Sequence, residues 1–395
     1  MPPRLHAEAA PRRDPRMSMI PITRPETGDA EIAAATRVLR SGWLTQGPEV
    51  AAFETEFAAL VGSPHACAVA NCTNALHLAL LALGIGHGDE VATVSHSFIA
   101  TANAVRYVGA EPVFVDIDAT TLGMDAAALA TAITPRTRAV LVVHQVGMPC
   151  DLSGLLAVAS AHGLPIIEDA ACALGSEIRL DGAWQWIGRP AGRIACFSFH
   201  PRKVISCGEG GMLTTADPTL DARFRLLRQH GMTVPDTARH GAAQVIFEQY
   251  AELGYNYRMT DLQAAVGREQ LRRLPWILER RRHLAQRYHT ELGQRVPSVT
   301  LAVQPPWARS NWQSYPVWLP AGCDQRAVMQ AMLDAGIATR RGIMNAHREP
   351  PYGGHAWTLP VSEAAQDRII LLPLFPALEE ADQDRVVTAL AAALA

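Results

Sequence analysis

The sequence predicts an α/β protein built on a largely parallel sheet. Between Ala66 and Thr215, short and almost wholly apolar runs alternate with stretches of helical periodicity. Strands that are apolar on both faces and separated by helices of this kind are typical of a parallel sheet with helices on both sides. The chain has 395 residues, of which 49% are hydrophobic and 18% charged, so it can bury a large core.

The expected strands can be assigned in order along this segment. They lie at residues 66–70, 90–94, 111–116, 139–144, 164–169, 194–199 and 211–215. Helical stretches follow the first four of these runs, beginning near residue 73, covering 99–107, beginning near 125 and covering 151–162. Ligands usually bind beyond the carboxyl ends of such strands, so the residues just after each run are the candidates for a functional site.

The pattern changes after about residue 235. Residues 260–292 indicate a long amphipathic helix that is expected to break at Pro275, and residues 312–395 mix short strands with helices. We expect a disordered N-terminal extension over residues 1–19 and a large domain, with an N-terminal arm, over residues 20–250. Connecting helices and a smaller α+β domain are expected over residues 251–395.

Composition and charge exclude several classes of protein. A formal net charge of −3 gives no basic surface for nucleic acid. No apolar run reaches the roughly 18 residues of a membrane-spanning helix. The seven cysteines are scattered without a CxxC pair, so neither disulfides nor a metal site are expected. The opening residues lack the apolar core of a secretory signal, and we expect a cytoplasmic protein.

Polar residues follow the first strand, at the start of the next helix. Thr73 and Asn74 lie in this first turn, behind Asn71. Free backbone N–H groups and the positive end of the helix dipole favour a phosphate there. The alternative is an ordinary N-cap by Asn71 or Thr73.

An acid and an amine follow two later strands. Asp169 ends the run "LPIIED", and a carboxylate buried there would need a positive partner unless it caps the next segment. Lys203 comes shortly after "CFSFHP", where desolvation and the neighbouring Arg202 would lower the pKa of its amine and make it nucleophilic. The alternative for Lys203 is a solvated loop residue.

Together these three features match the anchors of pyridoxal 5'-phosphate. A lysine forms a Schiff base with this cofactor, an acid keeps its ring nitrogen protonated, and a cradle of N–H groups holds its phosphate. The combination therefore predicts a pyridoxal-phosphate enzyme.

Five segments in order resemble the DegT/DnrJ/EryC1/StrS family of sugar aminotransferases: "SGWLTQGPEVAAFETEFA", "SFIATANAVRYVGAEPVFVDID", "EDAACALG", "FSFHPRKVISCGEGGMLTT" and "GYNYRMTDLQAA". The similarity extends over about residues 20–390. It implies a fold-type-I aminotransferase, with a large domain whose mixed sheet is mostly parallel, a small C-terminal domain, and a homodimer with shared active sites.

The resemblance also implies roles for individual residues. Lys203 would form the Schiff base and act as general acid and base, and Asp169 would face the pyridine nitrogen. The other implied cofactor contacts are Thr73, Asn74 and Ser198 at the phosphate, Phe98 and Ala171 on the two faces of the ring, and Asn256 at the phosphate of the neighbouring subunit.

Substrate contacts are implied where the sequence departs from the family pattern. Cys172 stands where histidine or glutamine is common, near the donor and the sugar, and His200 stands in a variable position that packing alone would also explain. The region 336–354 corresponds to the acceptor side of the small domain. Its candidates for a donor carboxylate or a sugar phosphate, each with solvation as the alternative, are Arg340, Arg341 and His347.

The expected reaction moves an amino group from glutamate or glutamine to a keto sugar, with a nucleotide-linked sugar as first choice. Three alternatives stay open. The acceptor is a keto-cyclitol such as an inosose, the enzyme is a pyridoxal-phosphate sugar dehydratase, or the protein is a scaffold that lost its chemistry. Family dehydratases carry histidine at the position of Lys203, which favours amino transfer.

Overall fold

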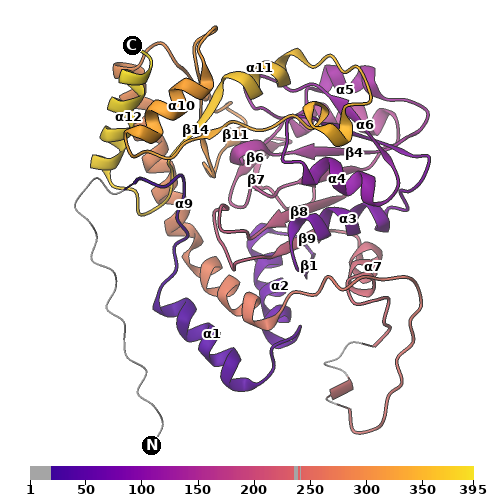
Figure 1. The fold of residues 1–395 in the computed structure, drawn as a ribbon. Coiled ribbons are helices and arrows are strands. Elements are labelled where there is room, and N and C mark those ends of the chain that lie inside the picture. The colour runs from indigo at the N-terminus through magenta and orange to yellow at the C-terminus, as the bar shows by residue number, and fades with distance from the viewer. Residues whose placement is uncertain (1–18, 235–238, 241) are drawn as a thin grey trace, which may run out of the picture.

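The computed structural model describes residues 19–234, 239–240 and 242–395, and its centre is a seven-stranded sheet (Figure 1). β9 is antiparallel to both of its neighbours, and the remaining pairs are parallel. The predicted mixed and mostly parallel sheet is therefore confirmed. In spatial order the strands are β1 (His65–Val69), β9 (Gly211–Thr215), β8 (Ile194–Ser198), β5 (Ile166–Asp169), β4 (Thr137–Val143), β2 (Glu90–Val94) and β3 (Glu111–Val115).

Helices cover both faces of this sheet. The alternation of side chains along β4 shows this, because Ala139 and Leu141 join one buried cluster while Val140 and Val142 join another. The helices of the first cluster are α3 (Cys72–Ala82), α4 (Ala100–Tyr107) and α7 (Pro218–Leu227). Those of the second are α2 (Pro48–Val61), α5 (Ala126–Ala132), α6 (Leu152–Ala161) and α9 (Asp261–Arg295).

The C-terminal part of the chain forms a second, antiparallel sheet with its own core. Its strands in order are β10 (Thr300–Leu301), β12 (Tyr315–Trp318), β14 (Ile369–Leu372) and β13 (Arg340–Arg341). The core contains residues of α10 (Gln325–Asp334), α12 (Glu380–Ala393) and the second half of α9. Ile20 of the N-terminal arm also packs there and bridges to Ile337.

A third, small sheet was not predicted. β6 (Glu177–Leu180) and β7 (Ala183–Trp186) form a hairpin that β11 (Ala308–Arg309) extends. The run "EIRLDGAWQW" is short and mixes charged with aromatic residues, so it lacks the continuous apolar character by which the other strands were assigned.

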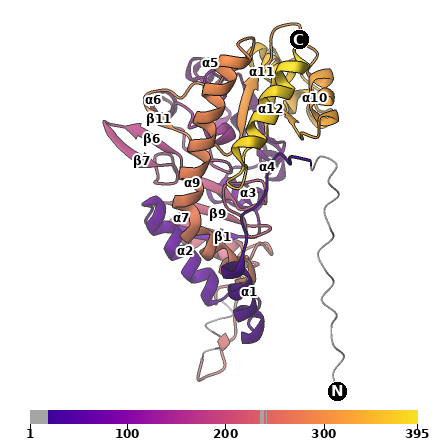
Figure 2. The ribbon, with the colours of Figure 1, turned by 90° about the vertical axis from the view of Figure 1, so that its left-hand side faces the viewer.

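The expected break at Pro275 is wrong, because α9 continues through it as one helix of 35 residues. A proline inside a helix removes one hydrogen bond and costs about 3 kcal/mol. Here α9 packs against α1 (Asp29–Ser41) and α2 along one half and against α12 along the other (Figure 2). The apolar area buried along this length offsets the missing bond.

Other expectations concern the ends of the chain and the membrane. Apart from Met19, the extension expected over residues 1–19 lies outside the described residues. Within the part of the chain that the structure describes, no helix combines the length and the apolar character that crossing a bilayer requires. All seven cysteines are free.

Candidate active site

The predicted site residues lie along one edge of the main sheet. Val69 at the end of β1 pairs with Gly211 at the start of β9, and Gly211 pairs with Ser198 at the end of β8. A Cβ on Gly211 would lie 2.5 Å from the carbonyl carbon and oxygen of Asn71. The glycine therefore lets β9 approach the chain where it enters α3, and it brings Ser198 near that helix start.

The first turn of α3 is capped by a side chain and stays partly exposed. Asn71 accepts a hydrogen bond from the Asn74 N–H at 2.9 Å, which makes it the N-cap. Thr73 and Asn74 are half-buried, and the Asn74 side chain hydrogen-bonds with Tyr257. Capping by Asn71 satisfies one backbone N–H, so the turn keeps the capacity for an anion that helix N-termini provide.

Asp169 ends β5 and is buried, with 5% of its surface exposed. Thr101, in the first turn of α4, donates to Oδ2 at 2.8 Å, and the Ala171 N–H donates to Oδ1 at 3.1 Å. Burial raises the pKa of this carboxyl group, and the two hydrogen bonds lower it by less. No lysine, arginine or histidine of the described residues forms an ion pair with Asp169.

Lys203 lies in the turn after β8, which its N–H closes on the carbonyl of His200 at 2.8 Å. Its Nζ donates to Cys172 Sγ at 3.1 Å. The prediction that the pKa of this amine is lowered is wrong. Burial does lower the pKa of Lys203, but the Cys172 sulfur and the Asp169 carboxylate raise it more, and Arg202 is not among the groups that act on it most.

Lys203 is also the only lysine in the chain, since the other basic side chains among its 35 lysine and arginine residues are all arginines. An arginine keeps its proton at all ordinary pH values, whereas a lysine amine can lose it and act as a nucleophile. The presence of a single lysine is therefore a feature of the sequence that points to Lys203 independently of its position after a strand.

The geometry fits a cofactor that carries a protonated ring nitrogen and an aldehyde. A buried carboxylate without an ion pair is costly unless a cation from elsewhere faces it. The ends of β5 and β8 adjoin, so the acid and the single amine lie together, and the charge of Asp169 acts on Lys203. Phe98, after β2, is 70% exposed and offers a ring on the same edge.

Asn256 lies on the surface of the single chain, next to a residue that contacts the start of α3. It is exposed and forms a bridge with Gln229. Its neighbour Tyr257 contacts the start of α3, through Asn74 and through its carbonyl, which accepts from the Ala70 N–H at 2.8 Å. The segment thus runs past the helix start while the Asn256 side chain faces outward.

The predicted substrate residues divide into two groups. Cys172 and His200 lie next to Lys203, and the ring of His200 accepts a hydrogen bond from the Arg202 N–H at 3.2 Å. Arg340 and Arg341 are exposed on β13, where Arg341 forms an ion pair with Glu349 at 3.6 Å.

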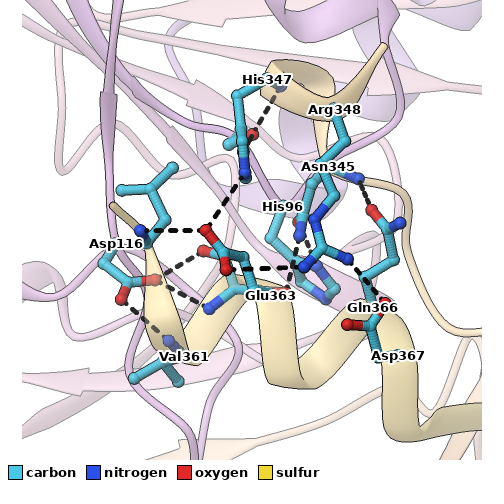
Figure 3. A network of polar contacts seen from close by, with 12 residues as sticks. His96, Asp116, Asn345, His347, Arg348, Val361, Glu363, Gln366 and Asp367 are labelled. Carbon is cyan, nitrogen blue, oxygen red and sulfur yellow. Dashed lines mark hydrogen bonds and ion pairs between the residues drawn. The ribbon is translucent and has the colours of Figure 1, made fainter. Parts of the chain in front are cut away.

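His347 takes part in a network of polar contacts, shown in Figure 3. Its ring lies 2.6 Å from Ser95 Oγ through Nδ1 and 3.5 Å from Glu363 through Nε2. Next to it, Asn345 Oδ1 lies 3.0 Å from His96 Nδ1. These contacts fasten the segment η2 (Ala346–Arg348) and α11 (Pro360–Arg368) to the end of β2. They give His347 structural partners, and its contact with a substrate stays a prediction.

Thr101 is the residue of the site that sequence reasoning missed. Its hydroxyl donates to Asp169 and lies 2.7 Å from the Ser97 hydroxyl. It belongs to the segment "SFIATANA", which the resemblance used, but only the pairing of β2, β4 and β5 shows that it reaches the acid. No group of three or more potential metal ligands was found in the described part of the chain.

A hollow of about 350 Å³ lies elsewhere, between the loops after β3 and β4 and the second sheet. Trp312, Trp318 and Arg368 line it. It contains none of the predicted site residues, and its walls carry no nucleophile other than hydroxyl groups, so the chemistry is better assigned to the edge with Lys203 and Asp169.

Comparison with solved structures finds aminotransferases that match 95% of this chain. The aminotransferase TlmJ from Streptoalloteichus hindustanus is 34% identical with a TM-score of 0.88, over 95% of this chain and 99% of that one. DesV from S. venezuelae, solved in complex with a ketimine intermediate, is 35% identical with a TM-score of 0.84, over 95% and 98%. The putative sugar aminotransferase Spr1654 from Streptococcus pneumoniae, in its PLP-form, is 27% identical with a TM-score of 0.86, over 95% and 98%.

The sequence match agrees with the structural comparison. A model of that family matches residues 25–391, nearly the whole chain. The sheet edge with its single lysine, its buried acid and its capped helix start lies within the matched region. The chain belongs to the DegT/DnrJ/EryC1/StrS aminotransferase family.

Proposed function

We propose that the protein is a pyridoxal-phosphate-dependent aminotransferase that moves an amino group from glutamate or glutamine to a keto sugar, in particular a nucleotide-linked one. The observation that carries this proposal is the position of the single lysine near a buried carboxylate, Asp169, that forms no ion pair among the described residues. Family membership and the PLP-form of a structural neighbour support the cofactor.

When bound, the cofactor supplies an electron sink that stabilises negative charge on the amino acid carbon. The Asp169 carboxylate would face the ring nitrogen and keep its proton there, and Thr101 would hold that carboxylate in place. Lys203 Nζ would bind the cofactor covalently and then move a proton at the substrate carbon. Cys172, 3.1 Å from that amine, would orient it.

Other residues would position the cofactor. Thr73, Asn74 and Ser198 adjoin one another at the start of α3 and would hold the phosphate, while Ala171 and Phe98 would cover the two faces of the ring. The exposure of Phe98 at 70% and of Asn256 fits a homodimer in which a second copy covers the edge and Asn256 reaches the partner's phosphate.

The unique lysine allows a direct test of cofactor attachment. Reduction of the pyridoxal-phosphate-loaded protein with borohydride should add one cofactor to one peptide, the one that contains Lys203, because the α-amino terminus is the only other primary amine. Mass spectrometry of the digest reads the result. Lys203→Ala should still bind the cofactor, without covalent labelling, and should lose amino transfer altogether.

The reaction itself is tested with glutamate and glutamine as donors and a panel of keto sugars and keto-cyclitols. Formation of an amino sugar supports the proposal, and preference for an inosose would move the acceptor to the cyclitols. A deoxygenated product would identify a dehydratase. Normal turnover by Lys203→Ala, or a label on the terminus alone, would overturn the assignment of Lys203.

A further inference from the structure

Residues 95–101 connect the end of β2 to α4 and carry two groups of the proposed cofactor site. One is Phe98, which is 70% exposed and would cover a face of the ring. The other is Thr101, which donates to Asp169 Oδ2 at 2.8 Å and whose hydroxyl lies 2.7 Å from that of Ser97. The path of this short segment therefore decides where an aromatic ring and the partner of the acid lie.

The segment is fastened by residues from the C-terminal part of the chain. An antiparallel bridge joins His96 to Asn345, and the two side chains meet in the network of Figure 3. The Ala346 N–H donates to the Ser95 carbonyl at 2.8 Å. The Ser95 hydroxyl accepts from the His347 N–H at 3.0 Å and lies 2.6 Å from Nδ1 of the same residue, to which it can donate its own proton.

The contact between His96 and Asn345 has a defined direction. Asn345 Nδ2 donates to the Ser362 carbonyl at 2.8 Å, which leaves Oδ1 to face His96 Nδ1 at 3.0 Å. An amide oxygen can only accept, so Nδ1 of His96 carries the proton. Both side chains are 0% exposed, so water does not compete for this hydrogen bond. The His96 carbonyl also accepts from Gln145 Nε2, so both parts of the chain hold this residue.

Resting on the proposed function, we propose that His96 and Asn345 are positioning residues for the cofactor. Their bridge and hydrogen bond hold residues 95–101 so that Phe98 lies over the ring and Thr101 reaches the acid. The two residues are 249 positions apart in the chain. The segment that follows β13 of the second sheet therefore shapes the cofactor site together with the main sheet.

His96→Leu tests this role, because leucine fills a similar volume without a hydrogen-bond donor. In absorbance titrations of the full chain, the dissociation constant of pyridoxal phosphate should rise by about threefold to tenfold, as expected for one lost hydrogen bond. At saturating cofactor, the visible circular dichroism of the bound cofactor should also fall, since this signal depends on how the protein holds the ring. A loss of overall stability in a protein that is still folded would leave the circular dichroism unchanged.

Three further variants make the result specific. His96→Asn places an amide nitrogen where Nδ1 lies, so it should restore both the affinity and the circular dichroism. Ser95→Ala removes the hydroxyl contact with His347 at little cost in volume, and it should change both measurements in the same direction as His96→Leu even if that variant does not fold. Tyr352→Phe removes a 2.6 Å hydrogen bond to Asn103 of α4, between the same parts of the chain but outside this segment, and it should match the wild type.

The outcomes separate the positioning role from the proposed function. If His96→Leu and Ser95→Ala keep the affinity and the circular dichroism of the wild type, the positioning role is refuted while the proposed function stands. The role is refuted equally if Tyr352→Phe shows the same changes, because any loosening between these parts of the chain would then suffice. If the wild-type protein binds no pyridoxal phosphate, the proposed function fails and the positioning role fails with it.

Discussion

Asp169 is a residue at which function and stability oppose each other. Its raised pKa means that the folded protein without cofactor binds this proton more tightly than the unfolded chain does. That contribution favours the folded state at low pH and is lost as the pH rises through the raised pKa. At neutral pH the unfolded chain has this carboxyl group ionised, so its burial lowers the stability of the cofactor-free protein.

Asp169→Asn should consequently stabilise the cofactor-free protein at pH 7 by on the order of 1 kcal/mol, and the gain should shrink as the pH falls toward the ordinary aspartate range near pH 4. Thermal unfolding at several pH values measures this. Amino transfer should fall by about 10²-fold or more, since the ring nitrogen loses its acid. A variant that is less stable than the wild type throughout would show that the carboxylate is not strained by burial.

At this scale the role predicted for Lys203 stays a prediction, while the prediction for its pKa can be compared with the structure. The expected effect of Arg202 on that pKa is wrong. Adjacent residues in a turn can point apart, and Cys172, 31 positions earlier in the chain, supplies the contact that raises the pKa of Lys203. Thr101 was not predicted because its contact, too, is distant in the sequence: 68 positions separate it from Asp169.

Among the elements, the contact of β9 with the start of α3 positions the predicted phosphate cradle. Gly211→Ala would place a Cβ 2.5 Å from the backbone of Asn71, which cannot move as a side-chain end can. We expect a loss of about 1–3 kcal/mol in the free energy of unfolding and weaker binding of pyridoxal phosphate.

Denaturant unfolding and cofactor titration test this prediction together. Gly354→Ala is the control, because an added Cβ there meets nothing within 4 Å, and its stability should stay within about 0.5 kcal/mol of the wild type. Unchanged cofactor affinity in Gly211→Ala would separate β9 from the phosphate cradle.

The elements that the sequence predicted correctly are those with a strong local pattern. The seven apolar runs became the seven strands of the main sheet, since most of their side chains are apolar and buried. The hairpin of β6 and β7 has no such pattern. The wrong prediction at Pro275 has another cause. The packing of α9 along its 35 residues stabilises the helix by more than the hydrogen bond lost at one proline costs.

Over the whole molecule, the single chain exposes large apolar side chains in the segment before Asn256 and at Phe98. Phe247 is 87% exposed, Val245 86% and Leu253 83%, all in the segment that leads to Asn256, and Phe98 is 70% exposed. Several large apolar side chains exposed within one short segment are typical of an interaction surface. They support the proposed homodimer, in which this segment lies over the partner's sheet edge.

The proposed sharing of sites can be tested by combining two defective chains. Lys203→Ala lacks the amine, and Asn256→Ala should hold the cofactor poorly, so each homodimer should be inactive at limiting pyridoxal phosphate. In a mixed dimer, one site would join the intact Lys203 of one chain to the intact Asn256 of the other. If the chains are co-expressed and combine at random, about a quarter of all sites should be intact, and activity should return to about that fraction of the wild-type value. If instead Asn256 serves the site of its own chain, every site of the mixed dimer carries one defect, and activity should stay absent at every mixing ratio.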